Sequence, residues 1–116
     1  MRSKLIKTDL ATLRPSGYVT AANVSDFHEK LTRTVSSDQH SVFLVDMHQV
    51  EFLDSAGLMA LVTARRHAQA MGKRFSICSL APSVRIIFEL TQLDKVFEIF
   101  DDRQSFDLSL EKAIAA

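Results

Sequence analysis

The stretch that decides this fold reads Val50-Glu51-Phe52-Leu53-Asp54-Ser55-Ala56-Gly57-Leu58. It places a polar pair, Asp54 and Ser55, between an apolar approach and a segment with helical spacing. Aspartate and serine are favoured at helix starts, because their side-chain oxygens accept hydrogen bonds from amides that have no partner within the helix. The stretch therefore predicts a loop that ends by starting a helix, with the hydroxyl of Ser55 at the helix start.

Elements on either side of this stretch alternate between helix and strand. After Ser55, apolar residues keep helical spacing until Gly72, which stands where a glycine C-cap is expected. Before it, residues 42–46 form a continuous apolar run that is typical of a strand covered on both faces. Residues 23–35 predict another helix, in which Asn23 caps the first turn by accepting a hydrogen bond from a free amide.

The rest of the chain extends the same alternation. Gly17 is expected to let the backbone turn or bulge before Tyr18, and Pro82 suits the first turn of a helix. Strands separated by helices predict right-handed crossovers and a mostly parallel sheet, which is an α/β fold. The remaining predicted elements are short edge strands at 5–8 and 12–15, strands at 75–80 and 96–100, and a last helix that begins after residue 102.

Length and composition are those of a globular protein with a single domain, which we expect to span residues 1–116. The 14 basic residues balance 14 acidic ones, so no charge excess points to nucleic acid or to an anionic membrane as a partner. Cys78 is the only cysteine and lies in an apolar run, which favours a buried thiol in a reducing compartment. No stretch has the pattern of a signal peptide or of a membrane span, so we expect a cytoplasmic protein.

Sequence motifs of catalysis are missing. No glycine-rich phosphate loop is present, and the histidines at positions 28, 40, 48 and 67 lack the spacing of metal ligands. We therefore expect no catalytic residue, no metal and no cofactor. A serine hydrolase that uses Ser55 is a remote alternative, because the Gly-x-Ser-x-Gly turn is absent and only the fold could bring a histidine base to this serine.

Two roles can be assigned to Ser55. Together with Asp54 it can simply cap a helix. Alternatively it can carry a phosphate, since the helix dipole and the free amides tolerate added negative charge at this end of a helix. Met59 and Ala60 point away from the core-facing stripe of the same helix, on the side of Ser55. They would suit a covering partner, unless another element of the same domain covers them.

The motifs of this chain resemble those of the STAS domain, a family that includes the anti-sigma factor antagonists of bacteria. The resemblance covers nearly the whole chain, and its four segments occur in the family's order: Val42–Asp46, Phe52-Leu53-Asp54-Ser55-Ala56-Gly57-Leu58, Ser79–Val84 and Leu90-Thr91-Gln92-Leu93. The resemblance implies a central sheet that is mixed but mostly parallel, with an antiparallel edge strand and four to five helices.

For function, the resemblance implies a protein-binding module that is switched by phosphorylation. In antagonists of this type, the serine after the aspartate, here Ser55, is phosphorylated by a partner that is both anti-sigma factor and serine kinase. The unphosphorylated protein would bind this kinase and release a sigma factor, and a PP2C-type phosphatase would restore it. The residues expected to contact the partner near the phosphorylated serine are Thr20, Asp46, Asp54, Ala56, Gly57, Leu58 and Met59.

Thr20 departs from the family's pattern. Many members carry an aspartate at this position after the early glycine, near the phosphorylated serine, so that Asp46 and Asp54 are the acidic residues expected beside Ser55 here. The resemblance also leaves an alternative output for the same domain, as a STAS subunit that serves a transporter or a lipid-trafficking ATPase complex.

Overall fold

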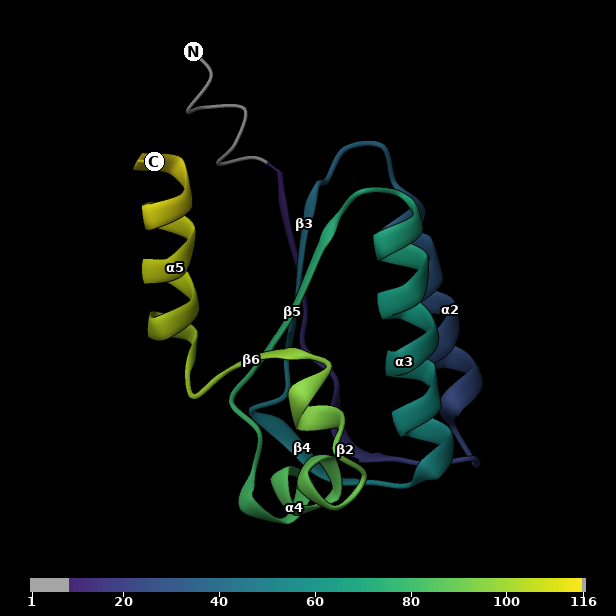
Figure 1. Cartoon of the computed structure of the whole chain (residues 1–116). Coiled ribbons are helices and arrows are strands. Elements are labelled where there is room, and N and C mark those ends of the chain that lie inside the picture. The colour runs from purple at the N-terminus through teal and green to yellow at the C-terminus, as the bar shows by residue number, and fades with distance from the viewer. Residues whose placement is uncertain (1–8, 116) are drawn as a thin grey trace.

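The computed structural model describes residues 9–115 and arranges them as two sheets with helices around them (Figure 1). The larger sheet has the strand order β1-β3-β5-β6, and the smaller one pairs β2 with β4. The strands are β1 (Leu10–Leu13), β2 (Ser16–Val19), β3 (Val42–Asp46), β4 (Gln49–Leu53), β5 (Arg74–Cys78) and β6 (Glu98–Phe100). The helices are α2 (Val24–Ser36), α3 (Ser55–Ala70), α4 (Pro82–Leu90), the 3-10 helix η1 (Leu93–Lys95) and α5 (Arg103–Ala115).

The core lies on both faces of the larger sheet. Helices α2 and α3 lie side by side on one face, and α5 lies on the other (Figure 1). Leu31 of α2 and Leu61 of α3 are fully buried in the main cluster, whereas Phe106 of α5 is buried in a smaller cluster with Leu44 and Cys78. Full burial of one such leucine or phenylalanine contributes about 1.5–3 kcal/mol. No helix in this part of the chain is long and apolar enough to span a membrane.

Most of the predicted elements are confirmed. The helix predicted over 23–35 is α2, and the helix that begins at Ser55 is α3. Gly72 follows the end of α3 with a φ of 71°, the left-handed conformation expected of a glycine C-cap. Pro82 is the first residue of α4, and the last helix begins at Arg103.

The approach to Asp54 is a strand rather than the loop that the sequence predicts. It forms β4, which pairs in parallel with β2. Only its second and last residues, Val50 and Leu53, are buried, so this strand lacks the strict alternation by which strands are recognised in a sequence.

A β-bulge breaks that alternation. Gly17 of β2 lies opposite Val50, and the next residue, Tyr18, lies opposite Phe52, which leaves Glu51 of β4 as the extra residue. Gly17 has a φ of 73°, a conformation that glycine adopts without strain. The irregularity expected at this glycine is therefore confirmed, and past it the side chain of Phe52 is exposed to solvent.

The strand arrangement differs from the expected single mixed sheet. The strands divide between two sheets, and Pro15, which has no amide hydrogen for a ladder, lies in the break between β1 and β2. Every pairing within residues 9–115 is parallel, so the expected antiparallel edge strand is not found there, and the edge strand predicted at 5–8 lies outside the described residues. The last strand begins at Glu98 because the chain before it forms η1.

Asn23 occupies the N-cap position of α2 without capping the helix through its side chain. Its amide oxygen accepts a hydrogen bond from the N–H of Thr20 at 2.9 Å, and its NH₂ group donates to the carbonyl of Tyr18 at 2.7 Å. The predicted cap bond is therefore wrong. The side chain instead closes the turn that leads into the helix.

Candidate functional site

Two strand-to-helix junctions meet at one edge of the small sheet. Because β2 and β4 are parallel, their carboxyl ends lie side by side, and each leads directly into a helix (Figure 1). The N–H of Asp54 donates to the carbonyl of Val19 at 3.2 Å, which ties the second junction to the first. The residues that the sequence singled out are grouped around these two junctions.

Asp54 holds both junctions with one carboxylate. Its Oδ1 accepts a hydrogen bond from the N–H of Gly57 at 3.0 Å, which is the predicted N-cap of α3. Its Oδ2 accepts one from the N–H of Ala21 in the neighbouring junction, also at 3.0 Å. These bonds, led by the one from Gly57, lower the pKa of Asp54 below its ordinary value. The carboxylate is therefore ionised at neutral pH and is engaged on both sides.

Ser55 is the first residue of α3, and its side chain is exposed. No hydrogen bond joins its hydroxyl to another group within residues 9–115. The capping role that the sequence allowed for this pair therefore falls to Asp54 alone, which leaves the hydroxyl open to solvent. The N–H of Gly57 is one of the helix-start amides that we expected to be free to interact with a phosphate. It already donates a hydrogen bond to the carboxylate of Asp54.

Gly57 fixes how closely α3 approaches the strand ends. A Cβ atom at this position would lie 2.6 Å from Cδ1 of Leu53 and 2.8 Å from the carbonyl oxygen of Val19. Both distances are far below ordinary van der Waals contact, so only glycine fits without a shift of the helix. The backbone around Ser55 is thus held by close packing as well as by hydrogen bonds.

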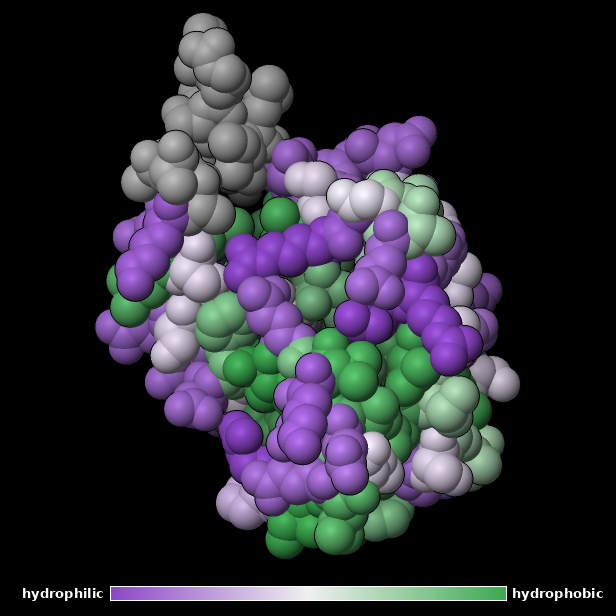
Figure 2. Space-filling view, in the orientation of Figure 1, coloured by the Kyte–Doolittle hydropathy of each residue, from purple (hydrophilic) through white to green (hydrophobic). Residues whose placement is uncertain are grey.

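Large hydrophobic side chains are exposed on α3 and on the small sheet. Met59 is 54% exposed and lies one helical turn along α3 from Ser55, on the same face. At the ends of the small sheet, Tyr18 and Phe52 are 62% and 42% exposed, and their ring centroids lie 5.9 Å apart. Figure 2 shows hydrophobic residues gathered over the end of the molecule where Figure 1 places α4 and the small sheet.

Tyr18 and Phe52 were not among the residues predicted from the sequence. Strict alternation along β4 would turn Phe52 to the same side as Val50, which is buried. The extra residue of the bulge reverses this direction and turns the aromatic ring outward. The available signal was Gly17, because a glycine at a bulge indicates that the pattern on the opposite strand has to be shifted by one residue.

Other predicted site residues are partly or fully covered. Thr20 is half-buried, and its hydroxyl accepts a hydrogen bond from the N–H of Ala22 at 3.2 Å. Ala56 is half-buried, whereas Gly57 and Leu58 are buried and offer no exposed side-chain surface. Ala60 is also buried, so the covering partner expected for it is the domain itself.

The structure does not bring Asp46 to this site. Its carboxylate accepts a hydrogen bond from the N–H of His48 at 3.0 Å and lies 3.5 Å from Nε of Arg14. Between Asp46 and Ser55 runs β4, whose five residues rise about 3.3 Å from one to the next, so that its first and last residues lie about 13 Å apart. The expectation of two acidic neighbours beside Ser55 is therefore met by Asp54 alone.

The geometry around Ser55 offers a hydroxyl without a base. None of the four histidines forms a hydrogen bond with it in the described part of the chain; His48 lies at the opposite end of β4, and His67 is near the far end of α3. The same residues contain no cluster of three side chains that could hold a metal ion. The site therefore presents an exposed hydroxyl at the start of a helix whose first turn is capped by Asp54.

Comparison with known proteins links this arrangement to one family. The STAS domain family matches residues 3–106 of the chain. Over 99 residues the chain is 27% identical to BtrV of Bordetella bronchiseptica, whose name assigns it provisionally to the anti-sigma factor antagonists, and the match covers 84% of each protein.

Solved structures with a similar fold include anti-sigma factor antagonists and a protein of the sulfate transporter family. A provisionally assigned anti-sigma factor antagonist from Thermotoga maritima has a TM-score of 0.82 at 20% identity, covering 89% of this chain and 88% of that one. The Bacillus antagonist SpoIIAA in its unphosphorylated form has a TM-score of 0.72 at 17% identity, covering 88% and 89%, and its phosphorylated form is also similar. A sulfate transporter family protein from Wolinella succinogenes has a TM-score of 0.79 at 12% identity, covering 93% and 89%.

Proposed function

The chain belongs to the STAS domain family, and on that basis we propose that it is an anti-sigma factor antagonist whose partner binding is switched by phosphorylation of Ser55. In its unphosphorylated form it binds a protein that is both anti-sigma factor and serine kinase. That kinase transfers a phosphate from ATP to the Ser55 hydroxyl and then releases the modified protein. A PP2C-type phosphatase reverses the change, and the cycle operates in the cytoplasm.

One observation carries this proposal: the Ser55 hydroxyl is exposed and unbonded on a junction that is held without it. A kinase can therefore reach the oxygen, and adding a phosphate breaks no hydrogen bond among residues 9–115. The backbone is kept in place by Asp54 and by the close packing of Gly57. The domain is then a substrate and a ligand, and the catalysis belongs to the kinase.

The phosphate acts on the partner rather than on the fold. It adds about one and a half to two negative charges at neutral pH, next to the ionised carboxylate of Asp54. The amides of Gly57 and Ala21 already donate hydrogen bonds to Asp54, so they are not free to pair with the phosphate. The added charge would then have to be paired by the partner protein that covers Ser55. A charge left unpaired in an interface costs several kcal/mol, and each loss of about 1.4 kcal/mol weakens binding tenfold.

Apolar contacts beside the hydroxyl supply the binding energy of the unmodified form. Met59 of α3 and Tyr18 and Phe52 of the small sheet are exposed, and aromatic side chains and methionine are enriched at the centres of interfaces. Because Met59 lies one turn from Ser55 on the same face of α3, a phosphate on Ser55 can prevent a partner from closing over this side chain.

The test compares two variants that differ in charge at position 55, together with a control that carries the same charge elsewhere. Ser55→Ala and Ser55→Glu are used as bait in extracts of the native host, with Thr32→Glu as the matched control, since Thr32 is exposed on α2 and gains the same charge away from the junctions. We expect the Ser55→Ala and Thr32→Glu proteins to retain a serine kinase and the Ser55→Glu protein to bind it at least about a hundredfold more weakly. Equal binding of the kinase by all three would contradict the switch.

A second function is favoured by one structural observation, the similarity to the sulfate transporter family protein. In that case the domain is a STAS subunit of a transporter or lipid-trafficking complex, and the same pulldown returns a transporter or ATPase subunit. Such a partner would be bound equally by the Ser55→Ala and Ser55→Glu proteins, so a single experiment separates the two functions.

A further inference from the structure

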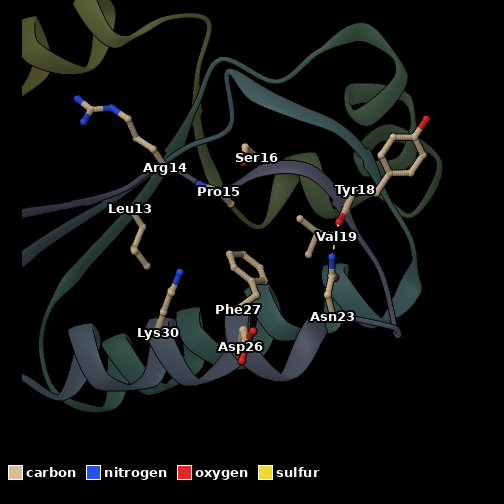
Figure 3. Close-up of a pocket in the computed structure, with 10 residues that line it drawn as sticks. All are labelled: Leu13, Arg14, Pro15, Ser16, Tyr18, Val19, Asn23, Asp26, Phe27 and Lys30. Atoms are coloured by element: carbon tan, nitrogen blue, oxygen red, sulfur yellow. Dashed lines mark hydrogen bonds between the residues drawn. The ribbon is translucent and has the colours of Figure 1, made fainter.

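A hollow of about 270 Å³ lies on the other side of the first junction, between residues 13–19 and the first two turns of α2 (Figure 3). This is many times the space that a single water molecule needs. That volume suits a small organic molecule. It is too small for a folded partner or for a peptide of several residues.

The lining of this hollow combines apolar and polar residues. Leu13 and Phe27 approach it from opposite sides, from β1 and from α2, and Val19 closes one end (Figure 3). Ser16 contributes a hydroxyl and Asn23 an amide to the lining. Sites for small ligands commonly combine an apolar enclosure with a few polar groups that fix the orientation.

The charge at the mouth is set by Lys30. Its side chain rises from α2 beside Leu13 and Phe27, and no carboxylate within residues 9–115 lies at ion-pair distance from its ammonium group (Figure 3). Arg14 also lines the hollow, but its guanidinium is directed away and pairs with Asp46 at 3.5 Å. The remaining charged group is Asp26, one turn before Lys30 on the same helix.

From this arrangement we propose that the hollow binds a small organic monocarboxylate, with its apolar body between Leu13, Val19 and Phe27 and its carboxylate on the ammonium of Lys30. A single cation matches a single negative charge. A phosphate or a dicarboxylate is disfavoured, because its second charge would face Asp26 without a partner.

Occupancy of the hollow is connected to the Asp54 junction through shared residues. Val19 lines the hollow, and its carbonyl accepts the hydrogen bond from the N–H of Asp54. Asn23 also lines it and closes the turn that presents the N–H of Ala21 to Asp54. Resting on the proposed function, a bound carboxylate therefore stiffens the support of Ser55 and changes the rate at which the kinase modifies it.

Binding is tested on the full chain without any partner, by titration of the ¹⁵N-labelled protein with hexanoate, hexan-1-ol and hexylamine. We expect saturable shifts of amides within residues 13–30 with hexanoate and weaker binding of the other two compounds. Lys30→Met should weaken hexanoate about fivefold or more, which corresponds to an ion pair of about 1 kcal/mol. Arg33→Met is the matched control, because Arg33 is exposed on the same helix, pairs with Glu29 and does not line the hollow.

Three outcomes would overturn the proposal: no saturable shift near the hollow, equal hexanoate affinity in the wild type and the Lys30→Met protein, or tighter binding of hexylamine than of hexanoate. The connection to Ser55 has its own readout, the rate of Ser55 phosphorylation with and without saturating hexanoate. An unchanged rate with binding intact removes that connection. A failure to phosphorylate Ser55 at all contradicts the proposed function and leaves the carboxylate site standing.

Discussion

The two strand-to-helix junctions at the small sheet lie side by side and are built in opposite ways. At the first, Asn23 stands in the N-cap position of α2 but turns its side chain back to Thr20 and Tyr18. At the second, Asp54 caps α3 through the N–H of Gly57 and also reaches across to the first junction. One polar side chain closes its own turn, and the other joins two turns.

The difference shows how one residue can be left free at a helix start. Because Asn23 closes the first turn, the N–H of Ala21 is presented to Asp54 as a fixed donor. Because Asp54 satisfies donors on both sides, Ser55 has no structural hydrogen bond to make. The first junction is thus a support for the second, at which Ser55 is exposed.

Among the variants at the two junctions, Gly57→Ala is expected to cause the largest loss of stability. The added methyl group would meet the side chain of Leu53 and the carbonyl of Val19, so α3 has to shift away from the strand ends. We expect a loss of about 3 kcal/mol in the free energy of unfolding, measured by denaturant titration. Gly72→Ala is the control, since its Cβ would meet nothing within 4 Å and only the positive φ costs energy, about 1 kcal/mol. Equal losses in the two variants would show that the junction is not tightly packed.

The next largest effect tests the hydrogen bond by which Asp54 joins the two junctions, from the N–H of Ala21 to its carboxylate. Asp54→Ala removes both the cap of α3 and the bond to Ala21, and it should lower the midpoint of thermal unfolding by several degrees. Asp102→Ala serves as the control because Asp102 makes only a local cap, to the N–H of Ser105 at 2.7 Å. If Asp102→Ala lowers the midpoint as much as Asp54→Ala, the bond across the junctions contributes nothing.

A smaller effect is expected from Asn23→Ala, which removes the two hydrogen bonds that close the first turn. Both groups are exposed, so the loss in unfolding free energy should be about 1 kcal/mol. The variant should also shift the amide resonance of Ala21, because that N–H loses its fixed position opposite Asp54. An unchanged Ala21 resonance would contradict the inference that Asn23 holds the N–H of Ala21 in position for Asp54.

The smallest effect is a change of stability with pH. The hydrogen bonds from Gly57 and Ala21 place the pKa of Asp54 in the folded protein below its ordinary value of 3.8. Its contribution is therefore fully present above about pH 4 and is lost as the pH falls through the lower, folded-state pKa. The stability gap between the wild type and Asp54→Asn should narrow over that acidic range, as followed by denaturant titration at each pH, and a constant gap would contradict the assignment.

The four α-helices could be predicted from the sequence, but strand β4 and the surface around Ser55 could not. Helical spacing and Gly72 placed α3 correctly, because these signals are local. The outward direction of Phe52 depends on a bulge between two strands, so it is set by pairing with Tyr18, which is distant in sequence. A pattern read along one strand cannot contain that information.

The side chains of the two junctions illustrate the same limit. Asn23 and Asp54 carry equivalent sequence signals for an N-cap, yet only Asp54 makes the bond. The local preference of Asn23 is overridden by the neighbouring backbone of Tyr18, which offers a carbonyl to its NH₂ group. Asp46 was misplaced for a related reason, because the intervening residues formed an extended strand rather than a compact loop.

Intact-mass and peptide mapping of the protein purified from its native host test the central claim most directly. The account predicts one added phosphate, located on Ser55, in a protein whose amide spectrum matches that of the unmodified form away from the junction. A phosphate found only on another residue, or a phosphorylated Ser55 that unfolds the start of α3, would contradict it.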